Sequence, residues 1–430
     1  MFIYTFINKY AKRLSIGTQA CVSIIEKSVK KILDKKLNLI VDNVIYCPLL
    51  NITECVEIES ENSFIAMIYN PLPRFISSWI RLPTITQDYQ ITDLNSSLAI
   101  SAEFSPVYDE TKKIPERNSK ANYNMIFKAD LPPLTLNMYK VTKISQSEMK
   151  QKNEQKSTDS IFLINQYLKI SFDSNANLVQ IDNLDTKIST PITQNICYYS
   201  SFNGNNSQPE FQASGAYIFR PLNNDPVCLN VTKFSLFNGK QFTELHQIFN
   251  DWISQTIRLY QDSQHVEFEW QIGPIDVQDN IGKEVITKFQ TNLKSNSLFY
   301  TDANGREMLT RKRNYRPTWS LNQTEYVSGN YYPINSRIFI RDEDSSQIKR
   351  QLTIVNDRSQ GGSSIEDGSI EIMLHRRVLH DDSLGVSEPL NEMGSDGNGL
   401  IANGLLHLFF NTTSNSARLH REGAHRMNNR

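Results

Sequence analysis

The sequence predicts a mainly β protein that begins with a helix. From Cys47 onward, short runs alternate apolar with polar residues, which is the period of a half-buried strand. Polar or glycine-containing turns separate these runs, and before Cys47 apolar residues recur at the spacing of a helix instead. Many short strands with frequent turns are typical of sandwich architectures.

The helix is expected first. Cys21, Ile25, Val29 and Ile32 fall on one face of a helical segment whose pattern stops after Asp34. A single amphipathic helix cannot bury its apolar stripe alone. We therefore expect this stripe to pack on a partner that the rest of the chain does not obviously provide.

The strands follow. The clearest is 266–272, where apolar side chains alternate with Glu267, Glu269 and Gln271, so one face is expected to be buried and the other wet. Residues 370–374 alternate in the same way, and 168–172 followed by the polar run 173–177 predicts a hairpin. Segment 144–160 has almost no apolar residues and predicts a domain boundary, whereas the segment from Thr412 onward has no clear period.

Composition excludes some function classes. The chain has 430 residues, 39% hydrophobic and 21% charged, which is enough to build several cores and argues against disorder. A formal net charge of −1 argues against a nucleic-acid binder. No run approaches the length needed to span a bilayer, and residues 1–7 lack the basic region and cleavage site of a secretory signal.

The densest polar cluster is His375–Asp382. Three interpretations compete. As a metal site, its two histidines and two aspartates have no known cage spacing. As an acid–base pair, adjacent Asp381 and Asp382 would point to opposite faces of a strand. As a pocket wall or loop clasp, its charges would pair with each other or with the hydroxyls of a ligand, and internal ion pairs alone are an equal alternative.

A second candidate is Tyr217 in Ser214-Gly215-Ala216-Tyr217. Small residues let the backbone approach closely, and Tyr217 adds an aromatic face and a hydroxyl, as sugar sites require. Core or sheet packing is the competing interpretation. The sequence contains no G-x-S-x-G elbow, no His-Glu-x-x-His and no Cys-x-x-Cys, so motif chemistry alone predicts neither a catalytic centre nor a structural zinc site.

Long segments of the chain resemble the C-terminal half of the lysosomal-type α-mannosidases of glycoside hydrolase family 38. The resemblance is carried, in the order of the family, by YAKRLSIG (10–17), CPLLNITEC (47–55), YNPLPR (69–74), SGAYIFRP (214–221), GPIDVQDNIGKEVITKF (273–289), 299–342 and 351–392. It covers about 10–410. Such ordered agreement is more specific than any short motif.

The resemblance implies four regions. Residues 1–45 would be a short remnant of a helical bundle, 46–150 a small β-sandwich, 151–410 a galactose-mutarotase-like β-supersandwich, and 411–430 an irregular tail. The family's N-terminal catalytic domain, which holds the zinc and both catalytic carboxylates, is not matched. We therefore expect a C-terminal fragment or truncated gene model that binds no zinc itself, contains no catalytic residue and is inactive alone.

The resemblance also implies roles for particular residues. Tyr217 resembles a tyrosine that hydrogen-bonds bound mannose, and Arg376, or second Arg377, resembles an arginine at the pocket edge. Cys47–Cys55 resembles a short disulfide, whereas the family partner of Cys21 would lie in the unmatched domain. In the full enzyme, zinc holds the sugar hydroxyls and an aspartate attacks the anomeric carbon, releasing mannose with retained configuration.

The expected partners are mannose-containing glycans and the missing catalytic domain, without nucleic acid or a membrane span, and homo-oligomerisation stays open. The family implies the lysosome. Asn-x-Ser/Thr sequons occur at Asn51, Asn95, Asn205, Asn230, Asn322 and Asn411, about as many as chance supplies in this composition. The alternative hypothesis is a free-standing, non-catalytic carbohydrate-binding β-sandwich protein.

Overall fold

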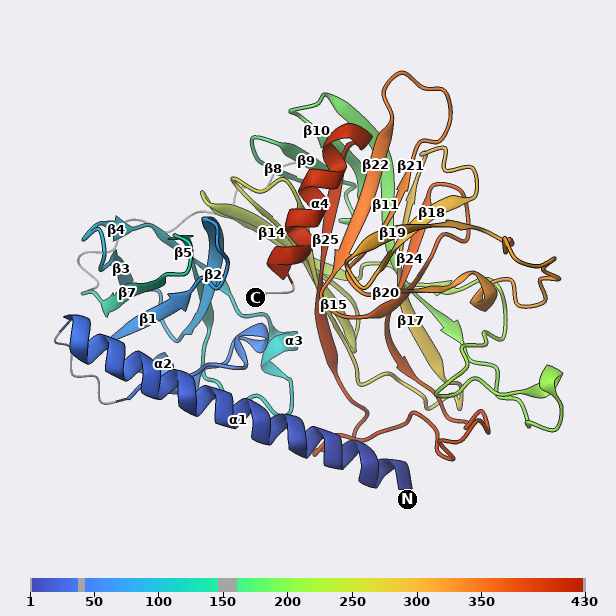
Figure 1. Cartoon of the computed structure of the whole chain (residues 1–430), viewed down its shortest axis with the longest axis horizontal. Coiled ribbons are helices and arrows are strands. Elements are labelled where there is room, and N and C mark those ends of the chain that lie inside the picture. Colours follow the sequence, from blue (N-terminus) through green and yellow to red (C-terminus); the bar gives the residue numbers. More distant parts are fainter. Residues whose placement is uncertain (1, 38–42, 146–160, 428–430) are drawn as a thin grey trace. The chain divides into compact units, whose positions relative to one another are not determined.

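The computed structural model describes residues 2–37, 43–145 and 161–427 (Figure 1). The chain divides into two compact units, Met1–Gln151 and Lys152–Arg430. Strands account for most of the regular structure of the described chain, so the prediction of a mainly β protein with an N-terminal helix is confirmed. No helix within the described ranges is long and apolar enough to cross a membrane. The predicted linker 144–160 lies almost entirely outside the described residues.

The first unit is a small β-sandwich preceded by a helix. Its two sheets, as far as the structure describes them, share a core that includes Ile91, Phe127 and Tyr139. One sheet has the order β1 (Ser63–Tyr69), β7 (Leu136–Lys143), β3 (Tyr89–Asp93), β4 (Ala99–Ile100), and the other β2 (Ile76–Thr84), β6 (Tyr123–Leu131), β5 (Ala102–Pro106). The turn η1 (Leu50–Ile52) and the short helix α2 (Val56–Glu59) precede β1, and the short helix α3 (Asp109–Lys112) lies between β5 and β6.

Helix α1 spans Phe2–Leu37, three residues beyond the end that the apolar pattern predicts and within the region 1–45 expected to be helical. The predicted stripe is largely exposed: Ile25 is 59% exposed, Ile32 is 46% exposed, and Cys21 is a free, exposed thiol. Leu33, on the neighbouring face, is buried. The described residues therefore leave the apolar stripe uncovered, as the sequence predicts.

The second unit is a large antiparallel sandwich. Within the described residues it contains two nine-stranded sheets whose inner faces share one core, including Phe268, Trp270 and Phe289. Two short 3-10 turns lie in its loops: η3 (Pro209–Phe211) between β11 and β12, and η4 (Ser328–Asn330) between β19 and β20. The first sheet runs β20 (Tyr332–Ile334), β23 (Gln360–Ser363), β24 (Ser369–Arg377), β17 (Lys283–Thr291), β11 (Ile188–Ser200), β10 (Leu178–Asn183), β9 (Leu168–Phe172), β8 (Ile161–Ile164), with β12 (Val227–Cys228) paired to β11.

The second sheet carries the clearest strand of the sequence. It runs β13 (Lys233–Asn238), β14 (Phe242–Asn250), β15 (Ile253–Tyr260), β16 (Val266–Ile272), β25 (Ala402–Thr412), β22 (Arg350–Asn356), β21 (Arg337–Arg341), β18 (Leu298–Ala303), β19 (Glu307–Lys312). The apolar residues of β16 face the core as predicted. Glu267 is not wet, however: it is 1% exposed and lies 3.4 Å from the Arg258 guanidinium.

The prediction that residues 411–430 form an irregular tail is wrong for most of that segment. Helix α4 spans Thr413–Met427 and lies across β22 and β25 (Figure 1). Leu419, Ala424 and Met427 pack on Val355, Leu405 and Phe409 of those strands. Ser416, His420 and Gly423 are also buried in this helix. Because they are not apolar residues of the usual kind, the helical period of the buried face is not visible in the pattern of apolar residues.

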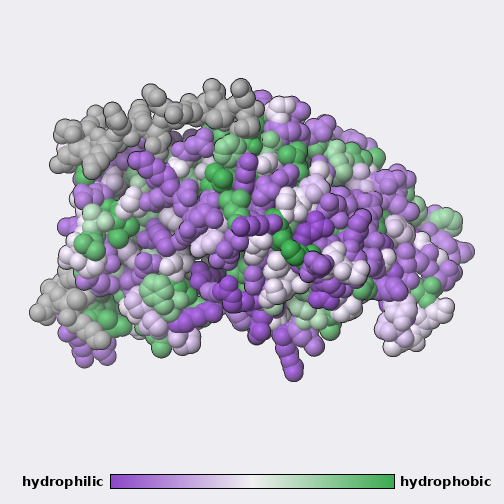
Figure 2. Space-filling view, turned by 90° about the horizontal axis from the view of Figure 1, so that it is seen from above, coloured by the Kyte–Doolittle hydropathy of each residue, from purple (hydrophilic) through white to green (hydrophobic). Residues whose placement is uncertain are grey.

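On the face that Figure 2 shows, hydrophobic residues occur as small patches. Figure 2 shows a largely hydrophilic face with separate hydrophobic spots. Exposed Tyr217 and Phe211 belong to the long segment between β11 and β12, the light-green loop of Figure 1.

Candidate functional site

The candidate site is built around the turn that carries Tyr217. This turn lies in the loop between β11 and β12, not in a strand, and the Tyr217 side chain is 63% exposed. The turn closes on itself: the Gly215 N–H donates to the Ile218 carbonyl (2.9 Å), and so does the Ser214 hydroxyl (3.1 Å). Sheet packing therefore does not occupy the aromatic ring or its hydroxyl.

Asp382 holds the backbone of this turn. Its Oδ2 accepts hydrogen bonds from the N–H groups of Tyr217 (2.6 Å) and Ile218 (3.1 Å), and its Oδ1 accepts from the N–H of Leu384 (3.1 Å). The side chain is fully buried. Such charge-assisted bonds offset the desolvation of a buried carboxylate.

The two adjacent arginines of β24 have different surroundings. Arg376 Nη2 donates to the Ile218 carbonyl (3.3 Å) and to Ser214 Oγ (3.4 Å). Arg377 instead donates to the Asn391 side chain (2.6 Å) and the Ile275 carbonyl (2.8 Å). Arg376 is therefore the arginine that contacts the turn carrying Tyr217.

Arg376 also forms an ion pair with a buried carboxylate. Its Nε lies 2.7 Å from Glu284 Oε2, and Glu284 is directly opposite Arg376 in the pairing of β17 with β24. Burial raises the pKa of the Glu284 carboxyl above its ordinary value, while the nearby guanidinium opposes that shift. The ion pair with Glu284 therefore holds the guanidinium in the position from which it contacts the turn.

An aromatic contact anchors the other end of the turn. Phe219, two residues after Tyr217, packs edge-on against Tyr199 and Tyr331, with ring centroids 5.6 and 5.4 Å away. Both tyrosine hydroxyls donate to Glu371 Oε2, at 3.0 and 2.9 Å. Burial raises the pKa of Glu371.

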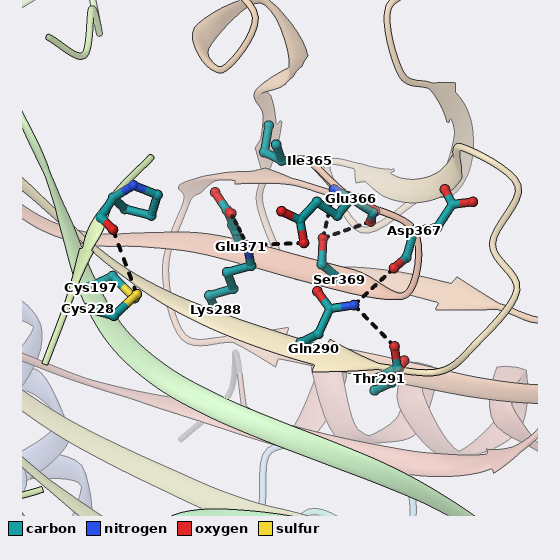
Figure 3. Close-up of polar contacts among 12 residues, drawn as sticks. Cys197, Cys228, Lys288, Gln290, Thr291, Ile365, Glu366, Asp367, Ser369 and Glu371 are labelled. Carbon is teal, nitrogen blue, oxygen red and sulfur yellow. Dashed lines mark hydrogen bonds and ion pairs between the residues drawn. A yellow bond between two sulfur atoms is a disulfide. The ribbon is translucent and has the colours of Figure 1, made fainter. Parts of the chain in front are cut away.

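Glu371 has a cationic neighbour on the same face of the sheet. Lys288 Nζ of β17 lies 3.6 Å from Glu371 and 3.5 Å from Glu366, between the two carboxylates (Figure 3). The network is built from side chains of β11, β17 and β24 that point away from the sandwich core. Phe219 of the β11–β12 loop packs on the two tyrosines of this network.

Two disulfides occur in the described residues. Cys47–Cys55 is the pair that the resemblance implies. Cys197–Cys228 joins β11 to β12 and was not predicted, since cysteines 31 residues apart carry no pairing signal in one sequence. It closes the segment that contains Tyr217.

The cluster His375–Asp382 does not converge on one point. His375 Nε2 lies 3.2 Å from the Leu400 carbonyl, His380 is exposed, and Asp381 accepts from the Ser383 N–H (3.0 Å) while Asp382 turns to the Tyr217 turn. The geometry fits a loop clasp better than a metal cage or a joint acid–base pair. That Asp382 binds backbone amides 165 residues away could not be inferred from its spacing.

Elsewhere in the described part of the chain, His265, Glu267 and His407 could hold a metal ion, because their donor atoms lie within 4.8 Å of one another. They belong to the sheet that does not carry the Tyr217 loop. His407 Nε2 lies 3.3 Å from Glu267 Oε1, and the two imidazole rings stack with centroids 4.1 Å apart. Ion pairing and ring packing account for these contacts, so we assign no metal to them.

The large sandwich and its clasped loop define the protein class. Residues 163–384 match the C-terminal domain of the glycosyl hydrolases of family 38, and the chain belongs to this family. The resemblance found in the sequence is thereby confirmed.

Particular relatives are α-mannosidases. The chain is 41% identical to the lysosomal alpha-mannosidase of Bos taurus over 391 residues, which are 90% of this chain and 36% of that protein. It is 38% identical to the lysosomal alpha-mannosidase of Homo sapiens (90% of this chain, 37% of the relative) and 35% identical to the alpha-mannosidase of Canavalia ensiformis (90% and 41%). The chain thus spans little more than a third of the length of these relatives.

Solved structures agree in fold. The chain matches the crystal structure of an alpha-mannosidase from Enterococcus faecalis with a TM-score of 0.53 at 13% identity, over 85% of this chain and 45% of that one. At this identity the match supports the architecture alone.

Proposed function

We propose that this chain is the C-terminal part of a retaining α-mannosidase that hydrolyses terminal α-mannosyl residues of N-glycans and glycoproteins. The observation that carries the proposal is the 41% identity to a lysosomal alpha-mannosidase over 90% of this chain. The exposed Tyr217 on a clasped turn supports it, since an aromatic ring with a free-facing hydroxyl suits a sugar.

Tyr217 would donate a hydrogen bond to a mannose hydroxyl and orient the ring; it would not transfer a proton. Arg376 is the arginine we place at the pocket edge, because it shares the turn with Tyr217. Arg377 is engaged by Asn391 and Ile275 and is the weaker choice.

Zinc does not fit the residues around Tyr217. Both oxygens of Asp382 accept backbone N–H groups, and Glu284 is paired with Arg376. We propose that the zinc of the reaction and its two catalytic carboxylates belong to the portion of the relatives that this chain does not match. The present chain would then supply substrate positioning and be inactive by itself.

We further propose a lysosomal location. The lysosomal relatives suggest it, and the two disulfides fit a protein that folds in an oxidising compartment.

The first test is an assay of the purified chain with zinc and an aryl α-mannoside. We expect turnover at background and less than stoichiometric zinc after dialysis. Turnover would contradict the proposal. If zinc remains bound to the chain but is lost in a His265→Gln/His407→Gln double variant, the metal lies at those histidines. Without turnover, such a site would not be the catalytic zinc site.

The second test separates the proposal from a stand-alone carbohydrate binder. Mapping the 5′ end of the transcript shows whether a catalytic domain is encoded in the same reading frame. In the longest protein that the gene encodes, Tyr217→Phe should lower kcat/KM for the mannoside, and Tyr69→Phe, another exposed tyrosine, should not. Mannose binding by the present chain alone, lost with Tyr217→Phe, would favour the non-catalytic binder.

A further inference from the structure

We infer that Asp382 is the positioning residue for Tyr217, and that with Arg376 it forms a clamp that holds the 214–218 turn in one conformation. This inference rests on the proposed function, in which Tyr217 contacts mannose. Asp382 would touch no substrate itself and would act through the backbone of the turn.

The hydrogen bonds point to the backbone rather than to a ligand. Two successive N–H groups, of Tyr217 and Ile218, converge on one carboxylate oxygen at 2.6 and 3.1 Å. The other oxygen is used by the Leu384 N–H at 3.1 Å, which holds Asp382 within its own loop. A carboxylate that is fully buried and accepts three N–H groups links two loops that are far apart in the sequence.

The turn also lies directly against Asp382. A Cβ added at Gly215 would meet the Asp382 backbone nitrogen at 2.6 Å and its Cβ and Cγ at 2.8 Å. Only glycine permits this approach without displacing the backbone. The same two loops are joined further by Gln212 Nε2, which donates to the Asp382 carbonyl at 2.8 Å.

Arg376 binds a carbonyl group of the turn, whereas Asp382 binds its N–H groups. Arg376 donates to the Ile218 carbonyl at 3.3 Å from a guanidinium already fixed by Glu284. With donor and acceptor groups of Ile218 both engaged, the Tyr217 backbone is fixed while its side chain stays 63% exposed. Binding a sugar then costs little ordering of the loop, because the fold has already ordered it.

The clamp is tested first without substrate, by amide hydrogen exchange in the purified chain. We expect the Tyr217 and Ile218 amides to exchange at least ~10-fold faster in Asp382→Ala, because they lose their acceptor. Asp382→Asn keeps one acceptor oxygen and should give a smaller increase. Asp381→Asn, which alters the neighbouring carboxylate, should leave both amides unchanged.

Unchanged exchange of these amides in Asp382→Asn and Asp382→Ala would overturn the clamp. If Asp382→Ala does not fold, Asp382→Asn and Gly215→Ala decide the matter, since Gly215→Ala displaces the turn while retaining the carboxylate. Both should speed exchange of the two amides.

The second measurement is a double-mutant cycle on kcat/KM in the longest protein that the gene encodes. A positioning role predicts that Asp382→Asn lowers kcat/KM about 10-fold with Tyr217 present but less than about 2-fold in Tyr217→Phe. Equal losses in both backgrounds would overturn the positioning role. If Tyr217→Phe itself has no effect, the proposed function fails, whereas the exchange result still reports on the clamp.

Discussion

Cys197 and Cys228 are paired residues on adjacent antiparallel strands, and their disulfide closes the loop that presents Tyr217. The loop is thus fixed at three places: at its ends by the disulfide, at its turn by Asp382, and behind the turn by Phe219 between two tyrosine rings. A long exposed loop held in this way suits a surface that must meet a ligand in one shape.

Removing this disulfide should loosen the loop selectively. A Cys197→Ala/Cys228→Ala variant is expected to lose ~2–4 kcal/mol of unfolding free energy, because the unfolded chain gains the freedom of the closed segment. Chymotrypsin should cleave faster after Phe211, an exposed residue within the segment. The control is Cys47→Ala/Cys55→Ala, which should leave chymotryptic cleavage after Phe211 unchanged. Equal protection of this bond in both double variants would contradict the prediction.

Breaking the Glu284–Arg376 pair should cost more than breaking the contacts of Arg377. Arg376→Ala leaves a buried carboxylate without its guanidinium, and we expect a loss of ~3 kcal/mol in chemical denaturation. Arg377→Ala removes contacts with uncharged partners only and should lose less. The double variant Glu284→Gln/Arg376→Ala should be more stable than Arg376→Ala.

The same variant should show a pH signature. The Glu284 pKa is already raised in the folded chain, and without Arg376 it rises further. A carboxyl whose pKa is raised by folding binds more protons in the folded state, so Arg376→Ala should regain stability as the pH falls toward the ordinary range of Glu. A loss that is the same at pH 7 and pH 5 would argue against a buried charge.

Acid should weaken the attachment of helix α4 through His420. Burial, assisted by Arg337 and Arg421, lowers the pKa of His420 from 6.5 to about 4, and its ring stacks on Phe339. Because the folded-state pKa is depressed for a base, its stability contribution is complete above pH 6.5 and is lost between 6.5 and 4. Relative to His420→Gln, the parent chain should lose ~2–3 kcal/mol between pH 7 and pH 4.5. Parallel stability profiles of the two proteins would refute this.

The sequons should differ in occupancy. Asn51, Asn95, Asn205, Asn230 and Asn322 are exposed, whereas Asn411 is 5% exposed in β25 and its Oδ1 accepts the Thr412 N–H at 2.8 Å. A glycan on Asn411 would have to enter a packed sheet. Glycopeptide mass spectrometry of the chain, expressed through the secretory pathway of a eukaryotic host, should find Asn411 unmodified. A folded species modified there would show that β25 is arranged differently.

Local patterns predicted the strands because burial alternates with period two along them, as in β16. They could not predict which polar residues would be buried: Glu267 and Glu371 look like solvent-facing positions, yet Arg258 and two tyrosine hydroxyls engage them. Those partners come from other segments of the chain, so only the tertiary fold reveals them.

The candidate site was predictable in part. The roles of Tyr217 and Arg376 came from a family resemblance. The structure brings Arg376 of β24 against the turn that carries Tyr217, and the contact of both residues with sugar stays a prediction. Asp382 belonged to a cluster whose alternatives the sequence left open, because its hydrogen bonds go to backbone amides, which carry no sequence signal. Helix α4 was missed for a related reason, as serine, histidine and glycine form much of its buried face.

The uncovered stripe of α1 has a practical consequence for handling the chain. Leu14, Ile25 and Ile32 lie on one side of a long helix and are between 46% and 72% exposed. The free protein should therefore self-associate through this apolar surface. The apparent molar mass from light scattering should rise with protein concentration, and Leu14→Glu/Ile25→Lys should abolish that rise while leaving the melting of the β-sandwich units unchanged.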